Sequence, residues 1–223
     1  MLYQIISLLC FEALYYLVLC TLLFPNYRKY YVPAKMICST GFLVVAVLMT
    51  YKSGNYNRAL ILAPIFILCY LGDLFLGFKH KENASKIFLI LGTISFLLAH
   101  TYFAILFIRS DGIKFYDLIA PILSVVFVYI TSKKDEYNLG KFLPMAAVYG
   151  CILSLLTFKS ITHVLKTGLT SDIFIAVGAI FFLVSDVFVY ILYFRRTRPW
   201  PIHGLNLATY YFAMVCFAFS IYY

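Results

Sequence analysis

Residues 173–194 read IFIAVGAIFFLVSDVFVYILYF, an apolar run in which Asp186 is the one charged side chain. A helix needs about 20 predominantly apolar residues to cross the hydrocarbon core of a bilayer. Membrane strands are shorter and alternate between apolar and polar residues, which this run does not do. The run therefore predicts a transmembrane helix.

The composition of the whole chain is typical of an integral membrane protein. Of its 223 residues, 64% are hydrophobic and 12% are charged, and the mean hydropathy is +0.93. Soluble domains are only about half apolar and about a quarter charged. Apolar runs cover residues 3–24, 33–51, 59–78, 86–108, 117–131, 142–158, 173–194 and 203–223. They predict an all-α polytopic membrane protein, a bundle of about eight transmembrane helices that forms a single transmembrane domain over residues 1–223.

The basic residues occupy the short connections between these runs or the first few residues of a run, and they give the chain a formal charge of +9. This placement is typical of topogenic charges that contact anionic headgroups of the lipid bilayer, and it argues against binding to nucleic acid. Alternate connections, starting with the first, hold twelve of the 18 Lys and Arg residues. The positive-inside rule therefore predicts both termini on the non-cytoplasmic side. The first run lacks a basic start and a small-residue cleavage site, so we expect a retained helix rather than a signal peptide.

Four acidic or histidine side chains lie in the interior of the apolar runs, at least five residues from either end: Glu12, Asp73, His100 and Asp186. A carboxylate near the centre of a spanning helix costs about 2.5–3.5 kcal/mol on insertion scales. Such residues are expected to face the interior of the bundle, where they are candidates for function. The alternative for each is a structural hydrogen bond or ion pair between helices.

Asp73 and Asp186 lie at similar depths, about 8 Å and about 12 Å from the predicted cytoplasmic ends of their helices at about 1.5 Å per residue. His100 lies deeper in its helix. Other polar residues near the same side of the membrane are Lys35, Asn206, Thr209 and Tyr210. We expect these groups to converge in a concave, mostly apolar site that opens toward the cytoplasm and can take a lipid headgroup.

Short internal similarities relate the two halves of the chain. Residues 71–76, LGDLFL, resemble residues 184–189, VSDVFV, and residues 101–103, TYF, resemble residues 209–211, TYY. The spacing suggests two parallel four-helix halves, as in some transporter folds. Chance similarity in a chain built from few residue types is the alternative.

Several kinds of chemistry have no motif in the sequence. The patterns G-x-S-x-G and H-E-x-x-H and phosphate-cradling glycine loops are absent. The six cysteines lie in predicted helices without a C-x-x-C spacing, which is typical of inert buried thiols. Only His100 among the four histidines is deep in a helix, so a three-histidine zinc site is not expected. A single metal held by Asp73, Asp186 and His100 is a minor alternative, and the sequence predicts no metal and no cofactor.

Five short motifs resemble those of the YhhN-like lysoplasmalogenases, a family of small eight-helix membrane hydrolases. They are LGD at 71–73, FLLAHTY at 96–102, PMAAVYG at 144–150, GAIFFLVSD at 178–186 and TYY at 209–211. The resemblance runs from about Lys35 to the C-terminus. The chain departs from the family at Met36, where proline is common, and at Met214, where glutamine is common. The resemblance implies hydrolysis of the vinyl ether of a lysoplasmalogen to a fatty aldehyde and glycerophosphoethanolamine or glycerophosphocholine, in a bacterial cytoplasmic membrane or the endoplasmic reticulum.

That reaction suits a pair of carboxyl groups. A vinyl ether breaks after protonation of its β-carbon and capture of the resulting oxocarbenium ion by water, so the site needs one acid and one base. We predict that Asp73 and Asp186 are this catalytic pair and that His100 positions water or a proton. The predicted substrate-binding residues are Lys35, Tyr102, Ser185, Asn206, Thr209 and Tyr210, with Lys35 facing the phosphate. A proton-coupled transporter of a small lipid-like molecule and a non-enzymatic membrane scaffold remain the alternative functions.

Overall fold

The computed structural model describes residues 2–79, 85–197 and 201–223 of the chain. It is 88% helical, and no strand occurs among the described residues. Eight helices within these ranges are long and apolar enough to cross a membrane. The structure therefore confirms an all-α polytopic architecture.

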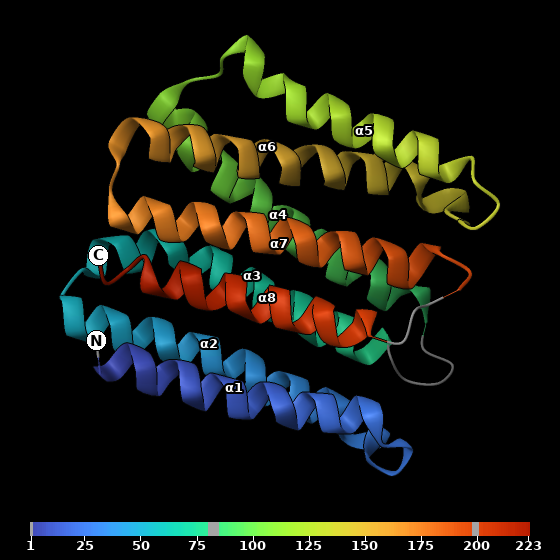
Figure 1. Cartoon of the computed structure of the whole chain (residues 1–223), viewed down its shortest axis with the longest axis horizontal. Coiled ribbons are helices and arrows are strands. Elements are labelled where there is room, and N and C mark those ends of the chain that lie inside the picture. Colours follow the sequence, from blue (N-terminus) through green and yellow to red (C-terminus); the bar gives the residue numbers. More distant parts are fainter. Residues whose placement is uncertain (1, 80–84, 198–200) are drawn as a thin grey trace. The chain divides into compact units, whose positions relative to one another are not determined.

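The helices follow one another through short connections (Figure 1). The long helices are α1 (Leu2–Leu23), α2 (Tyr31–Ser53), α3 (Tyr56–Lys79), α4 (Lys86–Asp111), α5 (Ile119–Ser132), α6 (Leu143–Thr167), α7 (Thr170–Phe194) and α8 (Ile202–Phe219). Three short 3₁₀ helices precede α2, α5 and α6: η1 (Pro25–Tyr30), η2 (Phe115–Leu118) and η3 (Gly140–Phe142).

The end of α6 corrects the sequence prediction, which placed it at residue 158. The helix continues to Thr167 and ends at Gly168, whose φ of 63° lies in the left-handed region that favours glycine. Lys159 appeared to mark a membrane boundary, but it is buried inside the helix because it pairs with Asp117. A charge with a partner can lie within a spanning helix, so it is no sign of a helix end.

The chain forms two compact units. Unit 1 comprises Met1–Ala99 together with Met214–Tyr223, and unit 2 comprises His100–Ala213. The boundary falls inside α4 and inside α8, so each of these helices contributes to both units.

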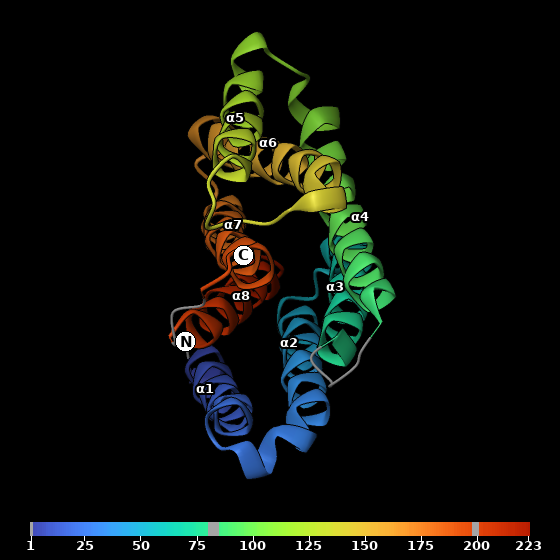
Figure 2. The same ribbon diagram turned by 90° about the vertical axis from the view of Figure 1, so that its right-hand side faces the viewer.

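In unit 1, α2 packs against both α1 and α3 (Figure 2). The α2–α3 contact includes the rings of Phe42 and Phe66, whose centroids are 6.0 Å apart. Gly72 on α3 and Gly92 on α4 allow these two helices to approach closely. A Cβ atom on Gly72 would lie 2.6 Å from the Phe96 ring, and one on Gly92 would lie 2.7 Å from Leu76. Small residues commonly permit such close packing between membrane helices.

The two chain ends lie together in unit 1 (Figure 1). The side-chain amide of Gln4 donates a hydrogen bond to the Tyr223 hydroxyl at 3.0 Å. Both termini are therefore at the same end of this unit, as an even number of crossings requires.

In unit 2, α6 packs between α5 and α7 (Figures 1 and 2). The connection between α5 and α6 is fastened to the end of α7 by two backbone hydrogen bonds. Asn138 N–H donates to the Phe194 carbonyl and Arg196 N–H donates to the Glu136 carbonyl, each at 2.8 Å. Leu139 of this connection packs with Val128 of α5 and Tyr190 of α7 in an apolar cluster.

Candidate functional site

Asp73 is held by two side chains from the neighbouring helix α2. Its Oδ1 lies 2.9 Å from Nζ of Lys35, and its Oδ2 accepts a hydrogen bond of 2.7 Å from the Ser39 hydroxyl. Lys35 and Ser39 are one turn apart, so they present their polar groups on the same face of α2. All three side chains are buried, and Asp73 is only 1% exposed. The carboxylate therefore has both a balancing charge and a neutral donor.

Asp186 on α7 has different surroundings. The hydroxyl of Tyr149, on α6, donates a hydrogen bond of 2.6 Å to Oδ2 of Asp186. Among the described residues, no cationic side chain lies within ion-pair distance of Asp186. The side chain is half-buried. The two predicted catalytic carboxyls thus differ in charge balance, since Asp73 pairs with a lysine and Asp186 accepts from a phenol.

Aromatic rings surround the buried His100 in unit 2. Its ring centroid lies 4.5 Å from that of Phe182 and 5.6 Å from that of Tyr149, both in edge-to-face arrangements. Tyr210 also packs edge-to-face on Phe182, at 5.3 Å. Because Tyr149 touches both His100 and Asp186, it joins the histidine and the carboxyl into one group.

The remaining predicted binding residues have distinct settings in unit 2. Ser185 and Asn206 form reciprocal hydrogen bonds, including one of 2.9 Å from the Asn206 side-chain amide to the Ser185 hydroxyl. The Thr209 hydroxyl donates to the Leu205 carbonyl at 2.8 Å, within its own helix. Tyr102 is half-buried on α4. Thus Ser185 and Asn206 link α7 to α8, whereas Thr209 bonds to its own backbone.

The structure therefore brings the predicted residues together in two groups. Lys35 and Asp73 meet in unit 1, and His100, Asp186 and Tyr210 gather around Phe182 and Tyr149 in unit 2. The pairing of Asp73 with Asp186 stays a prediction.

Two partners were absent from the predicted site, namely Ser39 and Tyr149. The position of Ser39 one turn after Lys35 was a usable signal, and Tyr149 lies within the PMAAVYG motif. Glu12 was expected to face the interior of the bundle, and this expectation is wrong. Its side chain is exposed on α1, and the Tyr16 hydroxyl lies 3.4 Å from its Oε1.

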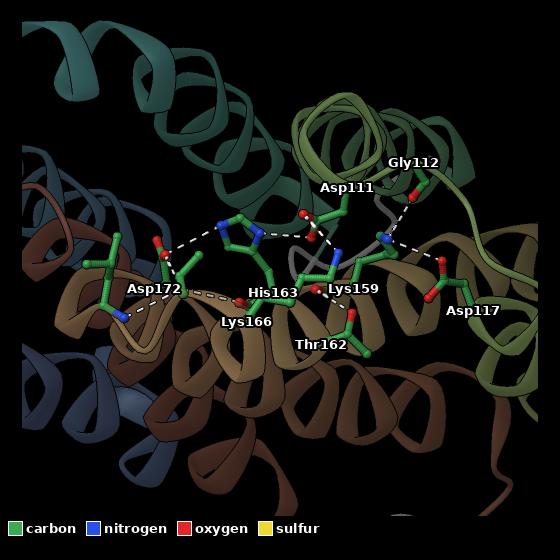
Figure 3. Close-up of polar contacts among 10 residues, drawn as sticks. Asp111, Gly112, Asp117, Lys159, Thr162, His163, Lys166 and Asp172 are labelled. Carbon is green, nitrogen blue, oxygen red and sulfur yellow. Dashed lines mark hydrogen bonds and ion pairs between the residues drawn. The ribbon is translucent and has the colours of Figure 1, made fainter.

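A further polar cluster contains charges from predicted connections together with Asp117, the first residue of the predicted run 117–131 (Figure 3). Lys159 on α6 lies 3.2 Å from Oδ2 of Asp117 and donates to the Gly112 carbonyl at 2.8 Å. Lys159 is 2% exposed, and Asp117 is completely buried. His163 follows Lys159 by one turn, and it contacts the carboxylates of Asp111 and Asp172. The spacing of Lys159 and His163 on one helical face was the signal for this cluster.

No group of three or more His, Cys, Asp or Glu side chains in the described ranges has an arrangement that could hold a metal ion. The side chains gathered here are carboxyls, an imidazole, a phenol and an ammonium group. They can donate and accept protons and balance charge, which are the requirements of acid–base chemistry.

The sequence of the YhhN family matches residues 9–221, nearly the whole chain. Neither a curated protein nor a solved structure matches the chain.

Proposed function

Because the chain belongs to the YhhN family, we propose that it is a lysoplasmalogenase-like hydrolase. Its substrate would be a lysoplasmalogen, and its products a fatty aldehyde and glycerophosphoethanolamine or glycerophosphocholine. The observation that carries the proposal is the contrast between two aspartates within spanning helices, one ion-paired and one bonded to a phenol. Acid-catalysed cleavage of a vinyl ether needs a proton donor and a base, and two carboxyl groups in different protonation states can supply both.

Asp73 is assigned the role of the ionised carboxylate. The Lys35 ammonium at 2.9 Å balances its negative charge, and the Ser39 hydroxyl at 2.7 Å donates to it. Both contacts favour the anionic form of this buried side chain. A carboxylate in this state can accept a proton from the attacking water and stabilise the oxocarbenium ion as it forms.

Asp186 is assigned the role of the general acid. It has no cationic partner among the described residues, so the neutral carboxylic acid is the form that needs no balancing charge. The Tyr149 hydroxyl occupies Oδ2 at 2.6 Å, which leaves Oδ1 to carry the proton that is transferred to the β-carbon. His100 packs against Tyr149 and positions this group.

The substrate-binding roles follow from the same contacts. Lys35 remains the candidate for the phosphate, although its bond to Asp73 adds a second role, that of counter-ion. The Ser185–Asn206 pair joins α7 to α8 one residue before Asp186, so it supports the position of the acid. Tyr102, Thr209 and Tyr210 are proposed to line the path of the lipid chain or headgroup.

A proton-coupled transporter is the second candidate, and the observation that favours it is the buried Lys159–Asp117 ion pair in unit 2. Ionisable residues inside membrane bundles often belong to proton pathways. One experiment separates the candidates: purified protein is incubated with a lysoplasmalogen, and aldehyde release is measured. The hydrolase releases aldehyde, whereas a transporter in liposomes releases none and shows flux that depends on a proton gradient. A scaffold shows neither.

A further inference from the structure

Figure 3 shows the polar cluster around His163 in unit 2. This cluster is remote from Asp186, the proposed catalytic acid. Asp172 and Asp186 both belong to α7, and about 21 Å of helix separates them at about 1.5 Å per residue. The proposed hydrolysis uses none of the side chains in this cluster.

His163 lies between two carboxylates from different helices. Its Nδ1 is 2.8 Å from Oδ2 of Asp111, at the end of α4, and its Nε2 is 3.4 Å from Oδ2 of Asp172, in the first turn of α7. A neutral imidazole has one N–H group and one nitrogen lone pair, so one nitrogen would direct its lone pair at a carboxylate oxygen. Only the protonated ring presents an N–H group to both aspartates.

The surrounding charges lead to the same protonation state. Lys166, on the same helix as His163, lies 3.2 Å from Oδ1 of Asp111. One turn before His163, Lys159 pairs with Asp117 of η2. The cluster thus contains three carboxylates and two ammonium groups, and a protonated His163 places a third positive group between two of these carboxylates. Burial makes an unbalanced charge costly, and the three side chains that meet at the ring are 15% exposed or less.

The ring also has an apolar cover. Phe107, one turn before Asp111 on α4, packs against the imidazole with centroids 5.2 Å apart. This ring excludes water from one side of the histidine. The N–H contacts to Asp111 and Asp172 are therefore the polar interactions that an incoming proton strengthens.

We propose that Asp111, His163 and Asp172 form a proton-binding site that, when protonated, fastens the end of α4 and the start of α7 to α6. Histidine is the side chain whose charge commonly changes between about pH 5 and about pH 8. Loss of the proton removes one of the two N–H donors and the positive charge that lies between the Asp111 and Asp172 carboxylates. The ends of α4 and α7 are then held less tightly, so local stability at this end of unit 2 falls as the pH rises. This inference does not depend on the proposed hydrolysis.

Hydrogen exchange of the purified full-length protein in detergent tests the proposal. After correction for the intrinsic effect of pH, exchange at residues 108–116 and 168–174 should become at least about tenfold faster between about pH 5 and about pH 8. His163→Gln should show fast exchange across this range. His203→Gln, the same replacement on α8, should keep the wild-type pH dependence. Exchange in the wild-type protein that does not change with pH would overturn the proposal.

A second measurement decides the matter if His163→Gln fails to fold. The ¹⁵N NMR signals of the histidine rings in the wild-type protein are assigned by replacing the other histidines one at a time. Near the low end of the range, His163 should give the spectrum of a ring protonated on both nitrogens, and it should lose this spectrum as exchange accelerates. A neutral tautomer throughout the range would contradict the proposal.

Discussion

Nζ of Lys35 lies 2.9 Å from Oδ1 of Asp73, and both side chains are buried. This distance makes the two residues a single charge-balanced unit that links α2 to α3. A test of either residue therefore has to compare its single variant with a variant in which both residues are replaced.

The first prediction concerns the ion pair itself. Lys35→Met should lower the free energy of unfolding by about 3–5 kcal/mol, because it removes the ammonium group that lies 2.9 Å from the buried Asp73 carboxylate. The double variant Lys35→Met with Asp73→Asn should recover part of this loss, since no unbalanced charge remains. Thermal or denaturant unfolding of the two single variants and the double variant in detergent measures the coupling. Strictly additive losses would show that the two side chains do not form a pair.

The second prediction concerns catalysis by the two carboxyls. Asp73→Asn and Asp186→Asn should each reduce kcat for lysoplasmalogen hydrolysis by at least about 10²–10⁴-fold, because an acid and a base are both required. Asp135→Asn removes the same charge at an exposed position and should leave kcat unchanged. Initial rates of aldehyde release, compared at equal amounts of folded protein, provide the measurement. Near-normal turnover in either of the two buried variants would exclude the paired-carboxyl mechanism.

The third prediction concerns Tyr149 as a positioning residue. Tyr149→Phe removes the hydrogen bond to Oδ2 of Asp186 and should lower kcat about 2–10-fold, the range expected for one hydrogen bond. It should also change the pH dependence of kcat, because the lost donor contacts the carboxyl that transfers the proton. Tyr190→Phe is the matched control: its hydroxyl contacts the Thr131 hydroxyl at 2.6 Å rather than a carboxyl. If both variants behave alike in the pH profile, Tyr149 is only a structural residue.

The fourth prediction concerns the close approach of α3 and α4. Gly72→Ala would place a Cβ atom 2.6 Å from the ring of Phe96, which is 6% exposed and has little room to move. We expect a loss of about 1–3 kcal/mol in the free energy of unfolding. Gly77→Ala, on the same helix, has its nearest neighbour at 3.6 Å and should cost much less. Equal stability of the two variants in a thermal unfolding assay would mean that α3 and α4 do not pack this closely.

The membrane architecture could be predicted from the sequence because hydrocarbon imposes a simple requirement. Each spanning segment must satisfy its own backbone hydrogen bonds and be apolar over about 20 residues, and both conditions are visible in runs such as residues 173–194. Helix ends were less predictable where a charge is buried. Lys159 resembled a boundary residue, since nothing near it in sequence reveals that Asp117 of η2 balances its charge.

The sequence was sufficient to select the candidate site residues but not to predict which residues they contact. Asp73, Asp186 and His100 could be selected because inserting an ionisable group into a bilayer costs free energy. Such groups are therefore usually functional or paired with another polar group. The partners of these three residues depend on which faces of neighbouring helices are in contact. The apolar residues around each of them in the sequence do not indicate those contacts. Lys35 was placed on the same side of the membrane as Asp73, yet only the register of α2 against α3 establishes the ion pair. Tyr149 became a candidate once α6 was seen to face Asp186.

The central claim is that a carboxylic acid in this protein protonates the β-carbon of a vinyl ether, and one isotope measurement tests it most directly. Purified protein is incubated with a lysoplasmalogen in D₂O, and the aldehyde is trapped at once and analysed by mass spectrometry. Protonation of the β-carbon predicts one deuterium on the carbon next to the aldehyde carbonyl, and the Asp186→Asn protein should form this product about 10²–10⁴-fold more slowly. Aldehyde released without deuterium at that carbon, or no aldehyde at all from the folded wild-type protein, would contradict the mechanism.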